Sequence, residues 1–134
     1  GKADIKAEGN DITVITYGLM VHYSLEAAKF VGKDGLSVEV VDLRTVRPLD
    51  KETIINSVKK TGKVLIVHED NKIGGIGGEI AAIVSEEAFE YLDGPVTRLA
   101  GPEVPAMPFA PTLEEEYMPN PKKIAEALRK LAAY

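Results

Sequence analysis

Apolar and polar residues alternate along the chain in blocks whose spacing predicts strands followed by helices. Residues 12–16, 38–43, 64–67 and 96–100 are short apolar runs rich in β-branched side chains, which predict buried strands. Between and after these runs, apolar residues recur every three or four positions, as on the inward face of a helix. The helices predicted in this way cover residues 21–31, 51–61, 79–92 and 121–133.

Polar and glycine residues at the ends of these blocks support the predicted boundaries. Asp50 precedes the second helix and can cap its amide groups, and Gly62 follows that helix as a stop. Asn120 and Pro121 form a cap followed by proline at the first helical position. Val64–Val67 is the most hydrophobic of the predicted strands, so we expect it at the centre of the sheet.

Strands that alternate with helices of this length predict an α/β fold with three layers, α/β/α. The sheet is expected to be mostly parallel, with right-handed crossovers and helices on both faces. Residues 3–7 are expected to add an edge strand, with a tight turn at Asn10–Asp11 leading into the next strand. Because 134 residues is close to the commonest size of one domain, we expect a single domain over residues 1–134.

One long segment lacks this periodicity. Five of the eight prolines lie between Gly101 and Pro121, which predicts an irregular surface segment. Its apolar residues cannot form a core of their own, and we expect those that stay exposed to form a docking surface. They are Met107, Phe109, Tyr117 and Met118.

Composition excludes several classes of function. A net charge of −5 without a long basic block argues against a nucleic-acid partner. The absence of cysteine excludes disulfides and thiolate sites and favours a reducing, cytoplasmic location. The longest apolar run is far shorter than the ~20 residues of a membrane span, so no membrane partner is expected. The first residues lack a signal-peptide core, so the chain is either not secreted or has lost a preceding segment.

The glycine-rich run Gly74–Gly78 allows two interpretations. Backbone amides at the start of a helix can bind a phosphate, which would suit a flavodoxin-like binder of a small phosphorylated ligand. However, a dinucleotide fingerprint requires a third glycine where Ile80 stands, and no Lys-Ser or Lys-Thr pair follows. The alternative is close backbone packing at the helix start.

Four polar residues lie at or just after the ends of predicted strands and are candidates for an interface or a ligand-binding edge. His68 and Glu69 come after the central strand, where open α/β sheets bind ligands. A structural or interface role for His68 is favoured over a small hydrolase, because no serine or cysteine nucleophile is placed near it. Asp42 and Arg44 could bind a substrate carboxylate or form an ion pair that fixes a loop. For His22, a structural role as a partly buried imidazole in the first helix is favoured.

Several stretches, taken in order, resemble one known family. They are Val40–Asp50 (VVDLRTVRPLD), the Tyr17–Gly18 turn, Lys60–Lys63, His68–Glu69 with the glycines that follow, and Asp93–Val96. They resemble the transketolase C-terminal-like domain as it occurs in β subunits of thiamine-diphosphate-dependent 2-oxoacid dehydrogenases. The stretch from Leu99 to Pro108 looks closest to the branched-chain type.

The resemblance implies a five-stranded sheet whose first strand is antiparallel to the rest. It also implies that thiamine diphosphate and Mg bind elsewhere in the parent enzyme, so that this chain holds no catalytic residue, cofactor site or metal site. The expected role is assembly and docking within an oxidoreductase that decarboxylates a branched-chain 2-oxoacid or pyruvate. The isolated chain is then expected to be inactive.

The partners implied by the resemblance are the α subunit, a second β subunit and the peripheral subunit-binding domain of an acyltransferase. In relatives the acyltransferase domain docks at the end of the third helix and at the chain's C-terminal carboxylate. By position this indicates Phe89, Asp93 and Tyr134 as partner-docking residues, facing arginines of a basic domain. Without its partners the chain is expected to form a homodimer.

Overall fold

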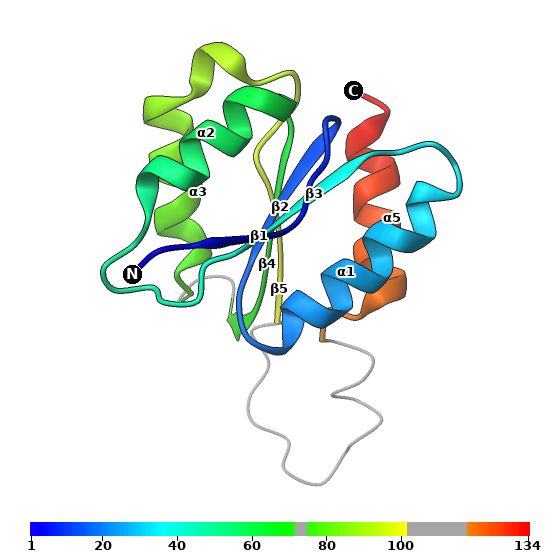
Figure 1. The fold of residues 1–134 in the computed structure, drawn as a ribbon, viewed down its shortest axis with the longest axis horizontal. Coiled ribbons are helices and arrows are strands. Elements are labelled where there is room, and N and C mark those ends of the chain that lie inside the picture. Colours follow the sequence, from blue (N-terminus) through cyan, green and yellow to red (C-terminus); the bar gives the residue numbers. More distant parts are fainter. Residues whose placement is uncertain (72–74, 102–117) are drawn as a thin grey trace, which may run out of the picture.

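The computed structural model describes residues 1–71, 75–101 and 118–134 and places a five-stranded sheet between two layers of helices (Figure 1). In chain order, the elements are β1 (Asp4–Ala7), β2 (Ile12–Thr16), α1 (Leu19–Gly32), β3 (Val38–Asp42), α2 (Lys51–Thr61), β4 (Val64–Asn71), α3 (Gly77–Glu87), a 3₁₀ turn (Phe89–Tyr91), β5 (Thr97–Gly101) and α5 (Pro121–Ala132).

The strands lie in the order β1-β3-β2-β4-β5, with β1 antiparallel to β3 and the other pairs parallel. This confirms the predicted three-layer α/β/α fold and its antiparallel edge strand. The Asn10–Asp11 turn, however, does not form a hairpin, because β1 pairs with β3 and not with β2. Strand β4 is an interior strand next to the middle position, which β2 occupies.

The helices divide between the two faces of the sheet. Helices α1 and α5 cover one face, and α2 and α3 cover the other (Figure 1). Alternate residues of each strand therefore belong to different cores. The α1/α5 core contains Val14, Val31, Val40, Leu65 and Leu128 among its buried residues. The α2/α3 core contains Ile15, Ile54, Val58, Ile66 and Val84.

The predicted helix signals act as expected. The Asp50 carboxylate accepts a hydrogen bond from the Thr53 amide at 3.1 Å, and the Asn120 side chain accepts one from the Lys123 amide at 2.8 Å. Gly62 ends α2 in the left-handed conformation, with φ of 77°, which glycine adopts without a steric penalty.

Three local predictions differ from the structure. His22 is exposed on the outer side of α1, so the expectation of a buried imidazole is wrong, because the inward line of that helix runs through Met20, Ser24 and Ala27. Strand β4 continues to Asn71, which places His68 inside the strand. The third helix ends at Glu87, and a 3₁₀ turn completes the segment for which the sequence predicts α-helix.

Candidate partner-docking surface

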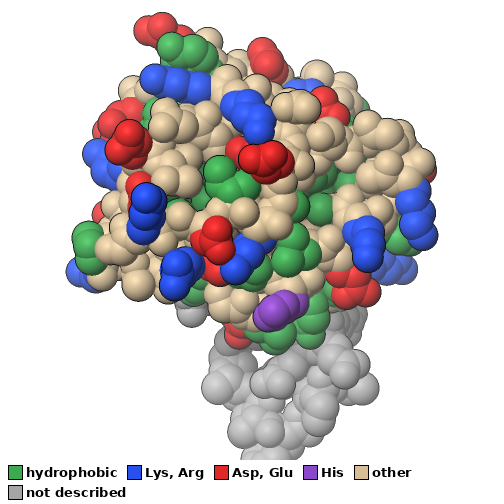
Figure 2. Space-filling model, viewed as in Figure 1, with side chains coloured by type: hydrophobic (Ala, Val, Ile, Leu, Met, Phe, Trp, Pro, Cys, Tyr) green, Lys and Arg blue, Asp and Glu red, His purple; other side chains and the backbone are tan. Residues whose placement is uncertain are grey.

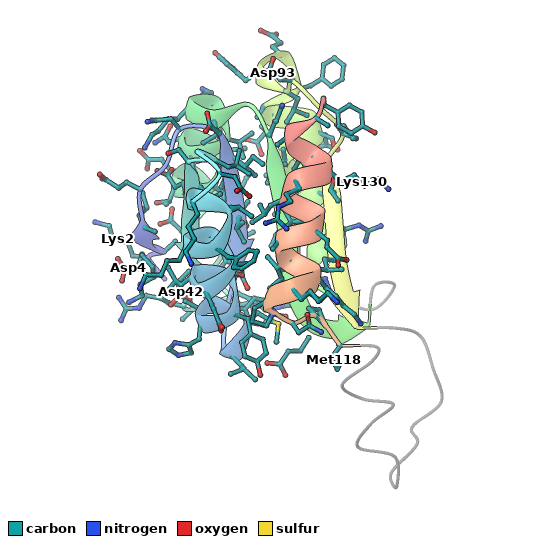
Figure 3. All side chains as sticks on the ribbon, turned by 90° about the vertical axis from the view of Figure 1, so that its right-hand side faces the viewer. Lys2, Asp4, Asp42, Asp93, Met118 and Lys130 are labelled. Atoms are coloured by element: carbon teal, nitrogen blue, oxygen red, sulfur yellow. The ribbon has the colours of Figure 1, made fainter. Side chains whose placement is uncertain are left out.

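The segment from Phe89 to Asp93 is held at the end of the sheet where the parallel strands begin. After the 3₁₀ turn, the Asp93 amide donates a hydrogen bond to the Gly62 carbonyl at 2.7 Å. The Asp93 carboxylate lies against the Cα of Gly62, so closely that a Cβ at Gly62 would meet it. The glycine that ends α2 therefore also makes room for this acidic side chain. Figure 3 shows Asp93 at the end of the molecule opposite Met118.

Tyr134 reaches the same end from the other face of the sheet. Its side chain packs against Gly94, where an added Cβ would lie 3.4 Å from the Tyr134 Cβ. Its backbone oxygen accepts a hydrogen bond from Lys63 Nζ at 2.9 Å, and the same amine donates to the Ala132 carbonyl at 3.2 Å. The chain end thus lies beside the Phe89–Asp93 segment.

We define the docking surface as Phe89, Asp93 and Tyr134, the three candidate residues that the resemblance implies. The structure brings them to one end of the molecule, although Tyr134 is 41 positions from Asp93 in the chain. The Phe89 side chain is 71% exposed and Tyr134 is 67% exposed. Such exposure of large aromatic side chains is typical of binding surfaces. Beside them lies an open pocket of about 730 Å³, lined by Ser85, Phe89, Glu90, Leu92, Gly94, Pro95 and Val96.

Carboxylates and lysines both lie near the docking surface, and Lys59 Nζ is 5.1 Å from the centre of the Tyr91 ring. Glu86, Glu90 and Asp93 are exposed within eight residues of one another. Nearby, Glu87 pairs with Lys51 at 2.8 Å, which neutralises one further carboxylate. On the face of the molecule seen in Figure 2, acidic and basic side chains are interspersed. The aromatic and acidic character of the docking surface suits a basic partner.

The four candidates at the opposite end of the strands do not converge on one site. His68 is fully buried and faces α3, where it packs against Gly77. Glu69 is exposed and lines a pocket on the α1/α5 face. Asp42 lies two strands away from β4, at a spacing of roughly 9.6 Å, and its carboxylate accepts the Arg44 backbone amide at 2.9 Å. No ion pair joins the Asp42 and Arg44 side chains, both of which the structure describes.

Gly77, at the start of α3, is explained by packing. A Cβ at Gly77 would lie 2.7 Å from the His68 Cδ2 atom, which is closer than real side chains approach. This supports the interpretation of Gly77 as a position of close backbone packing. Gly74 lies outside the described residues, as do Met107, Phe109 and Tyr117 of the predicted proline-rich docking surface. Met118 is described and is half-buried.

A buried polar cluster between β2, β3 and α2 is a feature that the sequence did not reveal. Glu39 of β3 is 1% exposed, and its carboxylate accepts hydrogen bonds from Lys60 Nζ and Ser57 Oγ, both at 2.6 Å. Thr13 Oγ1 lies 2.8 Å from the hydroxyl oxygens of both Ser57 and Thr61. Burial opposes ionisation of Glu39, but the hydrogen bonds from Lys60, Ser57 and the Gly9 amide outweigh it and lower the pKa of this carboxyl.

The family match and the similar known proteins agree with one another. The family described as "Transketolase, C-terminal domain" matches residues 1–124, and the chain belongs to this family. The sequence is 60% identical over its whole length to the 2-oxoisovalerate dehydrogenase subunit beta of Bacillus subtilis (strain 168). It is 48% identical to the pyruvate dehydrogenase E1 component subunit beta of the same organism. The chain spans 41% of the length of each of these relatives.

Solved structures agree with this assignment. A structure described as a split-gene transketolase, inactive beta4 tetramer, matches with a TM-score of 0.87 and 30% identity over 98% of this chain and 42% of that one. A transketolase from Pichia stipitis matches with a TM-score of 0.67 at 18% identity over 98% of this chain and 18% of that one, which shows the shared fold alone. The resemblance found in the sequence is therefore confirmed.

The described part of the chain offers neither a membrane span nor a cluster of metal ligands. None of the helices in residues 1–71, 75–101 and 118–134 combines the length and apolar character needed to cross a bilayer. Within the same ranges, no three histidine or carboxylate side chains are grouped so that they could hold a metal ion.

Proposed function

We propose that this chain is the assembly and partner-docking domain of the β subunit of a 2-oxoacid dehydrogenase. The parent enzyme would decarboxylate a branched-chain 2-oxoacid or pyruvate oxidatively, as part of an α/β heterotetramer with the α subunit and a second β subunit. The names of the relatives and their high identity support this role. The single observation that supports the docking function is the convergence of Phe89, Asp93 and Tyr134 on one exposed end of the fold.

Thiamine diphosphate and Mg would bind in the remaining part of the parent enzyme. The residues described in this chain are not arranged as a binding site for thiamine diphosphate and Mg. Its candidate polar residues, His68 and Glu69, face opposite sides of the sheet, and the start of α3 is filled by the His68 ring. The described side chains also offer no three-ligand metal cluster. The chain's own contribution would then be to present surfaces to other subunits.

The partner proposed for the docking surface is the peripheral subunit-binding domain of the acyltransferase. Its arginines would meet Asp93 and the neighbouring carboxylates, and an apolar side chain would cover Phe89 and Tyr134. Isothermal titration calorimetry with that domain tests the proposal, comparing the intact chain with one that lacks Tyr134. We expect saturable binding that is weakened by the deletion. Absence of binding to the intact chain would contradict the docking function.

Self-association of the isolated chain is a second part of the proposal. Surfaces that the parent heterotetramer would bury would be left open in the isolated chain, and a two-fold dimer is the simplest way to cover them. The related solved structure is described as an inactive beta4 tetramer, which supports association of β chains without α chains in that protein. Sedimentation equilibrium should give a dimer mass at high concentration, and a strict monomer would contradict this part of the proposal.

A further inference from the structure

The docking surface is assembled from two segments that share one anchor. Phe89 and Asp93 follow α3 on one face of the sheet, whereas Tyr134 follows α5 on the other face. Both segments are hydrogen-bonded to two consecutive residues, Gly62 and Lys63. The Gly62 carbonyl accepts the Asp93 amide at 2.7 Å, and Lys63 Nζ donates to the Tyr134 oxygen at 2.9 Å and to the Ala132 carbonyl at 3.2 Å.

The anchor is itself fixed by the buried polar cluster. The Lys63 carbonyl accepts the Thr13 amide at 2.8 Å and the Thr61 hydroxyl at 3.1 Å. Thr61 and Thr13 are joined by their hydroxyl groups, and Ser57 connects them to the Glu39 carboxylate. Because Thr13, Glu39, Ser57 and Thr61 are all at most 8% exposed, these bonds form where water does not compete.

From these contacts we propose that Lys63 is a positioning residue for partner binding. It sets the place of Tyr134 relative to Phe89 and Asp93 and makes no contact with the partner itself. The inference rests on the proposed docking function, which it deepens. Its physical basis is preorganisation, since a chain end already held in place loses less conformational freedom when a partner binds.

The role of Lys63 as a positioning residue can be separated from its charge. Removing a positive charge makes the docking surface more acidic, which by electrostatics alone would strengthen binding to a basic domain. Loss of positioning has the opposite effect. Lys63→Met keeps most of the apolar stem but deletes both hydrogen bonds to the chain end. The matched control is Lys130→Met, which removes the same charge from an exposed position on α5 (Figure 3).

The experiment measures two quantities on the full 134-residue chain and both variants. Calorimetry with the peripheral subunit-binding domain gives the Kd, and ¹H–¹⁵N heteronuclear NOEs of residues 132–134 report the order of the chain end. For Lys63→Met we expect a Kd about tenfold weaker and clearly lower NOEs. For Lys130→Met we expect unchanged NOEs and an unchanged or slightly tighter Kd.

The outcomes distinguish this inference from the proposed function. Unchanged NOEs in Lys63→Met overturn the positioning role, whatever the binding data. Lower NOEs with equal or tighter binding also overturn it. If the intact chain fails to bind the domain, the docking function falls, and the NOEs alone decide whether Lys63 orders the chain end. Should Lys63→Met not fold, Lys63→Gln replaces it in the same comparison.

Discussion

The two ends of the parallel strands use polar residues in opposite ways. At the carboxyl end, His68 is buried under α3, Glu69 faces the other layer and Asp42 caps a local turn, so these groups serve different contacts. At the amino end, residues from separate parts of the chain meet on an exposed surface. Open α/β sheets commonly bind ligands at their carboxyl end. For this chain we propose instead that recognition takes place at the amino end of the strands.

The sharpest test of this comparison is Phe89→Ala. Phe89 is the most exposed aromatic side chain of the docking surface, and burying it would supply much of the binding free energy. We expect the affinity for the peripheral subunit-binding domain to fall by about 2 kcal/mol, a factor of about 30, with an unchanged Tm. Calorimetry and thermal unfolding measure both effects. Phe30→Ala is the matched control, because Phe30 is also exposed but lies on α1. Equal losses in the two variants would contradict the assignment.

Gly77→Ala tests the structural role of the carboxyl end. The added methyl group meets the buried His68 ring, so we expect the free energy of unfolding to fall by about 1–3 kcal/mol. Partner binding should not change. In the control Gly78→Ala, the nearest atom is Arg98 Nη1 at 3.4 Å, and we expect a change within about 0.5 kcal/mol. Urea denaturation measures both variants, and equal stabilities would argue against the packing explanation.

Glu39→Gln tests whether the stability of the buried polar cluster depends on a charge. Because the folded-state pKa of Glu39 is below its ordinary value of 4.5, its contribution is present above pH 4.5 and is lost as the pH falls through the folded-state pKa. We expect the variant to be about 1–2 kcal/mol less stable at pH 7 and nearly equal to the original chain at strongly acidic pH. Urea denaturation across this range, with the exposed Glu26→Gln as control, should show the convergence for Glu39 alone. A difference that does not depend on pH would contradict the role of the carboxylate.

The smallest expected effect is that of Asp93→Asn. An exposed carboxylate contributes to attraction more than to tight packing, so we expect binding to weaken by less than about 1 kcal/mol. The difference between the original chain and the variant should shrink as salt is added, because the salt screens the charge. Calorimetry at two salt concentrations measures this. Asp34→Asn is the control, since Asp34 pairs with Arg129 and not with the docking surface. A loss that is unaffected by salt would mean that Asp93 acts through geometry.

The elements of the fold could be predicted because their signals are local. Asp50 and Asn120 mark helix starts by side chains that bond amides three residues away, and Gly62 marks a helix end by its backbone conformation. The strand that pairs with β1 could not be predicted from local signals. Asn10–Asp11 leads from β1 into β2, but the structure pairs β1 with β3, more than 30 residues further along the chain. His22 was expected on the buried side of α1, but that side is formed by residues such as Met20, Ser24 and Ala27.

The three residues of the proposed docking surface were indicated only by the resemblance to a known family. Nothing in the spacing of Phe89, Asp93 and Tyr134 indicates that they share one end of the fold. Lys63 and Glu39 were missed for the same reason, since their partners lie 71 and 18–30 positions away. A lysine after a helix-ending glycine and a glutamate inside an apolar strand are visible in the sequence, and the glutamate breaks the pattern of its strand. Such a break is a signal of a buried polar contact.

The separation of the hydrophobic interior by the sheet has a mechanical consequence. The α1/α5 core and the α2/α3 core lie on opposite sides of the strands, and the docking surface takes Tyr134 from the first side and Phe89 from the second. A partner that contacts both aromatic side chains would connect the α1/α5 layer to the α2/α3 layer at this end of the sheet. Local unfolding of either layer would then require the partner to dissociate. A bound partner should therefore slow local unfolding in both layers at once.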